Sequence, residues 1–259
     1  MEGNRMSLAA ETAPVKTVYA DGHTQSGVAE IIREGELNII VNQGNLARLI
    51  CTRTDLEYLV TGFLFTERII DSIDEIRSLH ISAYEDTARV ILDRYLHMQP
   101  VPRTDRSCCT GNLIMLDAVE KRPLRKVTDL TQWKSEDIFY LAGKFREQMP
   151  VHQTTESTHS CLLMRHGKIL YGCEDIGRHN SLDKVTGYAL SHKIPLSECI
   201  VYTSGRIPRD MTLKAAAAGI PVFVSKATPT AESVDLASEY GMTLICRAWE
   251  NWFEMFTGF

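Results

Sequence analysis

The sequence has few cysteines and no long hydrophobic run. Seven cysteines among 259 residues are an odd number, and they are far sparser than in small secreted domains held together by disulfides. The longest apolar run, residues 215–224, contains Gly219 and Pro221 and is shorter than the roughly 20 residues of a membrane-spanning helix. The first residues contain no apolar stretch typical of a signal peptide. These absences predict a cytoplasmic protein without a membrane segment or a disulfide framework.

The chain also lacks an excess of positive charge. Its 28 lysines and arginines are outnumbered by 33 aspartates and glutamates, which gives a net charge of −5. Because nucleic-acid binding needs a basic face, this balance argues against nucleic acid as the main partner. It leaves room for a local basic pocket that binds one small anion. The hydrophobic content of 44% and charged content of 24% are ordinary for a globular protein and exclude general disorder.

Neither common nucleotide-binding motif is present, since the sequence contains no GxxxxGK[ST] and no GxGxxG. A zinc hydrolase of the deaminase type is disfavoured as well. Such enzymes need an H-x-E followed by P-C-x-x-C, and structural zinc sites usually need a second cysteine pair. The sequence therefore predicts no metal site.

The first part of the chain predicts a small α+β unit. Residues 1–27 are polar and are expected to be frayed at the start, and two short strands are expected in residues 28–41 around a turn at Gly35. Residues 54–65 predict a helix with Thr54 as its N-cap, and alternating residues in 76–96 predict strands. A loop over 97–112, a short helix over 113–119 and a linker over 121–135 are expected to follow.

The second part predicts a more regular α/β arrangement. A helix over 137–149 and a hairpin made by 160–165 and 168–171 are followed by an amphipathic helix over 180–192, capped by Asn180 or Ser181. Strands over 199–203, 221–225 and 243–246 alternate with helices over 211–218 and 233–240, which end at Gly219 and Gly241. This order predicts a parallel sheet with right-handed crossovers. The fold class is therefore α/β with a smaller α+β domain, divided into residues 1–120 and 121–259.

The turns after the three predicted parallel strands suggest an anion site. Ligands collect beyond the carboxyl ends of such strands, where Ser204 and Arg206, then Lys226, and finally Arg247 are expected. Cations, hydroxyls and free helix N–H groups together would suit a phosphate. Alternatively, the hydroxyls only cap helices and the cations are only solvated, and the residues leave both interpretations open.

The segment Glu-Asp-Ile-Gly-Arg-His-Asn over residues 174–180 is dense in polar side chains and precedes a helix. Asp175 is expected either to orient His179 or to pair with Arg178. The alternative is a capped, salt-bridged loop without chemical function. His159 stands immediately before an apolar strand, where a lone histidine is more often structural.

Cys108 and Cys109 stand apart from the other cysteines because their loop is polar. Arg103 and Arg106 lie nearby in sequence, and cations stabilise the reactive thiolate form. The alternative is a pair of inert buried thiols, which is the usual state of free cysteine. The remaining five lie in apolar surroundings and are predicted to be structural: Cys51, Cys161, Cys173, Cys199 and Cys246.

Two long stretches, residues 174–190 and 204–245, resemble the formate dehydrogenase accessory sulfurtransferase family, FdhD. With weaker similarity upstream, the resemblance covers most of the chain. It implies a cytidine-deaminase-like α/β core with a mixed or parallel sheet flanked by helices, plus a smaller domain, in a homodimer. It further implies a sulfurtransferase that takes persulfide sulfur from a cysteine desulfurase. The acceptor would be the Mo-bis(molybdopterin guanine dinucleotide) cofactor of formate dehydrogenase, bound as a substrate.

The resemblance also implies roles for particular residues. Cys108 matches the first cysteine of the family's C-G-x-C-G loop, Gly111 takes the place of the second, and Cys109 is adjacent. The family's T-G-G-x-H stretch lacks both glycines here but ends at His159. Catalysis is thereby assigned to Cys108 and Cys109, and cofactor binding to Arg178, His179, Ser204, Arg206, Lys226, Arg247, Ala248, Trp249, Glu250, Asn251 and Trp252. The alternative function is a non-catalytic chaperone that binds the molybdopterin cofactor.

Overall fold

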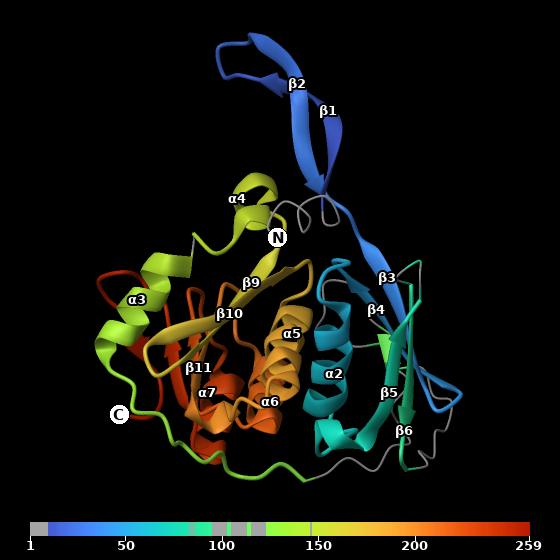
Figure 1. Ribbon diagram of the computed structural model, residues 1–259. Coiled ribbons are helices and arrows are strands. Elements are labelled where there is room, and N and C mark those ends of the chain that lie inside the picture. The colour runs from blue at the N-terminus through green and yellow to red at the C-terminus, as the bar shows by residue number, and fades with distance from the viewer. Residues whose placement is uncertain are drawn as a thin grey trace.

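The computed structural model describes residues 10–82, 84, 86–94, 103–104, 113–114, 123–145 and 147–259. Two six-stranded sheets dominate the described residues, with helices between and outside them (Figure 1). This mixed α/β architecture confirms the predicted fold class. The domain boundary expected at residues 120 and 121 falls outside the described residues.

The first sheet has the strand order β5-β6-β3-β4-β8-β7. One helix, α2, packs on it, because its apolar side chains and those of the central strands form a single buried cluster. The 3₁₀ helix η1 (Ile73–Glu75) precedes β5. The bounds are β3 (Gly35–Val41), β4 (Gly44–Cys51), α2 (Leu56–Thr66), β5 (Ile76–Ile81), β6 (Thr87–Leu92), β7 (Arg103–Thr104) and β8 (Leu113–Ile114).

The second sheet has the order β10-β9-β11-β12-β13-β14, and β11, β12 and β13 are parallel, as the sequence predicts. Two buried clusters cover its two faces, one facing α5, α6 and α7 and the other facing α3. The strands are β9 (His159–Arg165), β10 (Lys168–Asp175), β11 (Cys199–Thr203), β12 (Val222–Ser225), β13 (Thr243–Cys246) and β14 (Glu254–Met255). The helices are α3 (Ser135–Phe145), α4 (Pro150–Thr155), α5 (Arg178–Ser191), η2 (Leu196–Glu198), α6 (Arg209–Ala218) and α7 (Ala231–Tyr240).

Helices α2 and α5 join the two halves of the molecule, and they lie side by side between the sheets (Figure 1). They cross at two glycines. A Cβ atom on Gly62 would lie 1.8 Å from the Asp183 carbonyl oxygen, and one on Gly187 would lie 1.9 Å from that of Tyr58. The absence of side chains there lets the backbones touch, so α5 is buried on this side as well as on the side facing the sheet.

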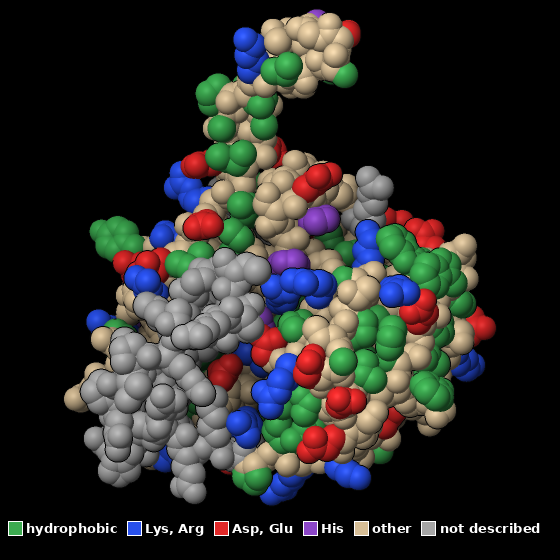
Figure 2. All heavy atoms as spheres, turned by 180° about the vertical axis from the view of Figure 1, so that it is seen from behind, with side chains coloured by type: hydrophobic (Ala, Val, Ile, Leu, Met, Phe, Trp, Pro, Cys, Tyr) green, Lys and Arg blue, Asp and Glu red, His purple; other side chains and the backbone are tan. Residues whose placement is uncertain are grey.

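The N-terminal region corrects an expectation. Residues 10–27, expected to be part of a frayed polar start, belong to a two-stranded antiparallel hairpin of β1 (Ala10–Val18) and β2 (Thr24–Ile32). The hairpin stands clear of the body of the molecule (Figures 1 and 2). It packs near α4 at its base. The polar composition of these residues did not indicate strands, because a hairpin that projects into solvent has little apolar surface to bury on either face.

Helix starts account for most of the other differences. Thr54 is not the N-cap of α2: Asp55 takes that position, and the Thr54 hydroxyl instead accepts a hydrogen bond from Lys184 (3.2 Å). The helix α5 begins at Arg178, so neither Asn180 nor Ser181 caps it. Residues 113–114, expected to be helical, form β8 because they pair with β4. The predicted ends at Gly219 and Gly241 are confirmed, with φ values of 73° and 72°.

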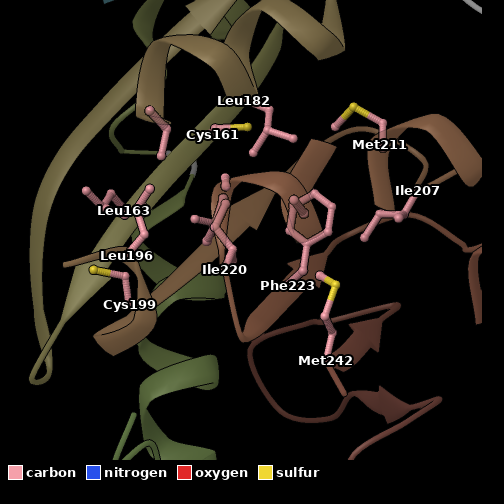
Figure 3. Close-up of a cluster of buried hydrophobic side chains, with 14 of the residues drawn as sticks. Cys161, Leu163, Leu182, Leu196, Cys199, Ile207, Met211, Ile220, Phe223 and Met242 are labelled. Carbon is pink, nitrogen blue, oxygen red and sulfur yellow. The ribbon is translucent and has the colours of Figure 1, made fainter. Parts of the chain in front are cut away.

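The five cysteines predicted to be structural are all buried and free. Cys161 and Cys199 lie among Leu163, Leu196 and other apolar side chains between the sheet and its helices (Figure 3). Burial raises the pKa of Cys161 to about 11 and that of Cys199 to about 12, so both remain protonated thiols at neutral pH. Among the described residues, none of the helices is long and apolar enough to cross a membrane.

Candidate functional site at the carboxyl edge of the second sheet

The three turns predicted to form an anion site meet at one edge of the second sheet. Because β11, β12 and β13 run parallel, the residues that follow them emerge on the same side. Backbone hydrogen bonds link the turns: Lys226 N donates to Thr203 O (3.0 Å), and Ala248 N donates to Ser225 O (3.0 Å). The predicted convergence of these turns is confirmed.

A cavity of about 730 Å³ opens at this edge, a size within the range of small-molecule sites. Three of the predicted binding residues line it, namely Ser204, Lys226 and Trp249. The opposite wall comes from the end of α3, from α4 and from the start of β9. The sequence did not assign this wall to the site, although it contributes His152, Glu156, Ser157, Thr158 and His159.

Lys226 and Trp249 form a cation–π pair in the cavity wall, with the ammonium nitrogen 5.0 Å from the centroid of the indole ring. Trp249 is 42% exposed, so the ring also offers a face to a ligand. An ammonium group attracts anions, and an indole face stacks on aromatic rings. The pair therefore suits a ligand that combines an anionic group with a flat heterocycle.

His159 gives the cavity a neutral hydrogen-bonding group. Burial lowers the pKa of His159 to about 4, and the nearby positive charge of Arg178 acts in the same direction. The imidazole is therefore uncharged at neutral pH, where one ring nitrogen donates a hydrogen bond and the other accepts one. His159 lines the cavity, a place that the expectation of a structural histidine did not include. The residue type alone carried no signal of that.

Glu174 holds the α4 wall in place. Its carboxylate accepts hydrogen bonds from the backbone nitrogens of Val151 (2.9 Å) and His152 (2.6 Å) and from the Thr158 hydroxyl (3.1 Å). A carboxylate at these N–H groups satisfies donors that lack a partner within the first turn of α4. Glu174 thereby attaches the short helix α4 to β10 and fixes the position of this cavity wall.

Asp175, the next residue, ties the second sheet to the first. Its carboxylate accepts hydrogen bonds from the backbone nitrogen (3.2 Å) and the hydroxyl (3.0 Å) of Thr52, at the end of β4. It also accepts one from the Asn180 side chain (2.8 Å) and pairs with Lys184. Of the two residues expected to partner it, His179 pairs instead with Asp210, at 2.7 Å between Nε2 and Oδ2, and pairing with Arg178 stays a prediction. The segment is thus a buried junction.

The remaining predicted binding residues lie at the same edge but outside the cavity lining that the structure describes. Arg206 is exposed, and Arg178 and His179 are buried in the first turn of α5. Arg247 pairs with Glu254 at 3.0 Å, and the buried Ala248 accepts a hydrogen bond from the Tyr202 hydroxyl (2.7 Å). The exposed residues that complete this set are Glu250, Asn251 and Trp252.

The two candidate catalytic residues, Cys108 and Cys109, lie outside the described residues, as does Arg106. In sequence they fall between β7 and β8. These two strands pair with each other, Arg103 with Ile114 and Thr104 with Leu113, and β8 continues the first sheet beside β4. The catalytic assignment stays a prediction.

Fold and site together define an α/β protein with a ligand-sized cavity at the carboxyl edge of a mixed sheet. Comparison with known proteins narrows this class. The family model of FdhD/NarQ matches residues 32–259, and the chain belongs to this family.

Individual relatives agree with this assignment. The sulfur carrier protein FdhD of Bacillus pumilus is 31% identical over 230 residues, which is 88% of each chain. That of Geobacillus kaustophilus is 30% identical over 241 residues, 92% of this chain and 91% of the relative. A crystal structure of a formate dehydrogenase accessory protein from Desulfotalea psychrophila matches with a TM-score of 0.79 at 23% identity, covering 96% of this chain and 97% of that one. This last match supports the fold.

Proposed function

We propose that the protein is a sulfur carrier required for formate dehydrogenase activity. In this proposal it acts as a sulfurtransferase that receives persulfide sulfur from a cysteine desulfurase and delivers it to the Mo-bis(molybdopterin guanine dinucleotide) cofactor. The observation that carries the proposal is the family match over residues 32–259, together with relatives that are named sulfur carrier proteins. A cytoplasmic location and a homodimer stay predictions.

Sulfur uptake is assigned to Cys108. Its thiolate attacks the terminal sulfur of the desulfurase persulfide, a new S–S bond forms to Cys108, and the S–S bond of the donor breaks. The desulfurase thiolate leaves, so the charge balances and no external oxidant is needed. Cys109 is the neighbouring thiol and the second candidate carrier.

The cavity supports the binding of the cofactor as a substrate. A guanine dinucleotide carries a flat base and phosphates, which suit the Trp249 ring and the Lys226 ammonium group. The neutral His159 adds a hydrogen-bonding group that does not repel a base. In this proposal the nucleotide end of the cofactor binds here, and Arg206 contributes positive charge at the rim.

Mass spectrometry of the intact protein tests the carrier role after incubation with a cysteine desulfurase and cysteine. We expect one added sulfur atom on the wild type and on Cys109→Ala, and none on Cys108→Ala. Sulfur loading that persists in Cys108→Ala but is lost in Cys109→Ala would move the role to Cys109. If neither variant changes the loading, the carrier proposal fails.

A cofactor-binding chaperone without sulfur transfer is the second candidate. It is favoured by Gly111, which stands where the family has its second cysteine. The two candidates differ in a complementation assay of formate dehydrogenase activity. If the protein is a sulfur carrier, Cys108→Ala should abolish maturation of formate dehydrogenase. If it is a chaperone, Cys108→Ala should leave maturation intact, whereas Lys226→Ala should impair it.

A further inference from the structure

A second cavity, of about 930 Å³, lies between the ends of α2 and α6 and the segment 123–130. This segment passes below α6 in Figure 1. Helix α6 starts beyond the carboxyl end of β11 and returns the chain to the start of β12. Its last turn therefore lies at the amino edge of the strands, opposite the cavity that contains Lys226. We call this second cavity the α6 groove.

One wall of the α6 groove is anchored to the body of the protein. Within the segment 123–130, Val127 N donates a hydrogen bond to Tyr240 O (2.8 Å), and Leu130 N donates one to Ser197 O (2.9 Å). The Val127 side chain packs against the main core cluster of the second sheet. These contacts attach the segment to the second half of the molecule and fix one wall of the groove.

The α6 groove combines positive charge with an exposed leucine among its described lining residues. Three cationic residues, Arg68, Arg125 and Lys126, line it against one carboxylate, Asp71, among the lining residues that the structure describes. Leu130 also lines it and is 55% exposed. The whole chain carries a net charge of −5, so this positive lining is opposite in sign to the net charge of the protein.

The ends of α2 and α6 explain only part of this composition. Cations complement the negative C-terminal ends of helices, which accounts for Arg68 and its neighbours. An exposed leucine gains nothing from a helix end, whereas covering it with another apolar surface is favourable. The charge and the leucine together therefore point to a ligand that has both carboxylates and apolar groups.

We propose that the α6 groove docks an acidic segment of a partner protein, with apolar side chains placed between its carboxylates. The carboxylates pair with Arg68, Arg125 and Lys126, and the apolar side chains cover Leu130. A small anion would leave the leucine exposed, and the overall negative charge disfavours a nucleic acid. This proposal goes beyond the sulfur-carrier function and is independent of it. A partner bound here leaves the opposite cavity open.

Fluorescence anisotropy with defined peptides tests the proposal on the full-length protein. The probe is a fluorescein-labelled peptide in which glutamates alternate with leucines, and its matched control has lysines in place of the glutamates. We expect saturable binding of the glutamate peptide only, weakening with added salt. Arg125→Glu combined with Lys126→Glu should weaken binding roughly tenfold, and Leu130→Ser should weaken it severalfold.

The control variant is Lys16→Glu combined with Lys168→Glu, which reverses the same amount of charge on exposed residues elsewhere. It should bind the glutamate peptide almost as the wild type does. Circular dichroism should show that all variants are folded. The proposal is overturned if both double variants lose the same affinity, if inorganic phosphate alone displaces the peptide, or if a single-stranded RNA probe binds the groove more tightly than the peptide does.

Discussion

Lys184 and Asp175 form an ion pair that is fully withdrawn from solvent, with Nζ 2.6 Å from Oδ2 and both side chains 0% exposed. The pair lies where the start of α5 meets the end of β4. The Lys184 ammonium also donates hydrogen bonds to the hydroxyls of Thr52 (2.9 Å) and Thr54 (3.2 Å). The buried pair and its hydrogen bonds thus connect α5 to the residues that follow β4 of the first sheet.

Removal of one partner of this pair should be severely destabilising. Lys184→Met leaves the Asp175 carboxylate buried without its counter-charge, and we expect a loss of about 3–5 kcal/mol in the free energy of unfolding. Urea denaturation followed by circular dichroism measures this loss. Lys184→Met combined with Asp175→Asn should recover part of it, because no unpaired charge remains.

The exposed pair between Arg247 and Glu254 provides the matched control, since its side chains are 50% and 40% exposed. Arg247→Met should change the unfolding free energy by less than about 1 kcal/mol. Equal losses for the buried and exposed pairs would contradict the importance assigned to Lys184.

The crossing of α2 and α5 should not tolerate a methyl group. In Gly187→Ala the new Cβ atom would lie 1.9 Å from the Tyr58 carbonyl oxygen, so the helices must separate, at a cost of about 3 kcal/mol or more. Gly143→Ala in α3 is the control, because its Cβ atom would meet nothing closer than 3.8 Å. There the better helix propensity of alanine should stabilise the protein by about 0.5–1 kcal/mol. The melting temperatures of both variants, measured by circular dichroism, test this prediction. Similar melting temperatures for the two would contradict close backbone contact between α2 and α5.

The neutral state of the half-buried His159 predicts a pH dependence of stability. Its pKa is about 4 in the folded protein, whereas an unperturbed histidine has a pKa of 6.5. Between these values the unfolded chain binds the proton and the folded protein does not, so stability falls as the pH decreases from about 6.5 to about 4. The contribution of this group amounts to at most about 3 kcal/mol. Urea denaturation across this range should show a weaker pH dependence for His159→Gln than for the wild type. Identical slopes would show that His159 does not contribute.

The cavity at the carboxyl edge should bind a guanine nucleotide through Lys226 and Trp249. With guanosine diphosphate as the probe, we expect quenching of tryptophan fluorescence on binding, which Trp249→Phe should largely remove. Lys226→Ala should weaken binding roughly tenfold, since one charge-assisted contact to phosphate is lost. Arg206→Ala, which changes an exposed cation outside the lining, should weaken it much less. A larger effect of Arg206→Ala would place the phosphate at the rim.

The regular elements of the second half were the most predictable part of the fold. Strands β11 and β13 have the predicted bounds, Cys199–Thr203 and Thr243–Cys246, because short apolar runs bounded by glycine and polar residues are strong local signals. The helix α5 was predicted from the sequence, but the expectation that it is amphipathic was wrong. Residues 178–187 are all buried, because α2 packs on the side that would otherwise face water.

The candidate site was predictable to the same degree. Ser204, Lys226 and Trp249 follow from the order of strands and helices and from the family resemblance, because parallel strands must release their following turns at one edge. His152, Glu156 and His159 come from a different part of the chain. The place of His152 and Glu156 depends on α4, which Glu174 holds by accepting hydrogen bonds from Val151 and His152, whereas His159 begins β9. No local pattern encodes these contacts.

By itself, the sequence determined the α/β class, the parallel order of the central strands, the five structural thiols and the family, since these depend on local hydrophobic patterns and on ordered motifs. The tertiary structure decided which charges are paired and which face a cavity. Asp175 pairs with Lys184, His179 with Asp210 and Arg247 with Glu254, whereas Lys226 contacts Trp249. These partners depend on how sheets and helices pack, because packing brings distant side chains together and removes water from between them.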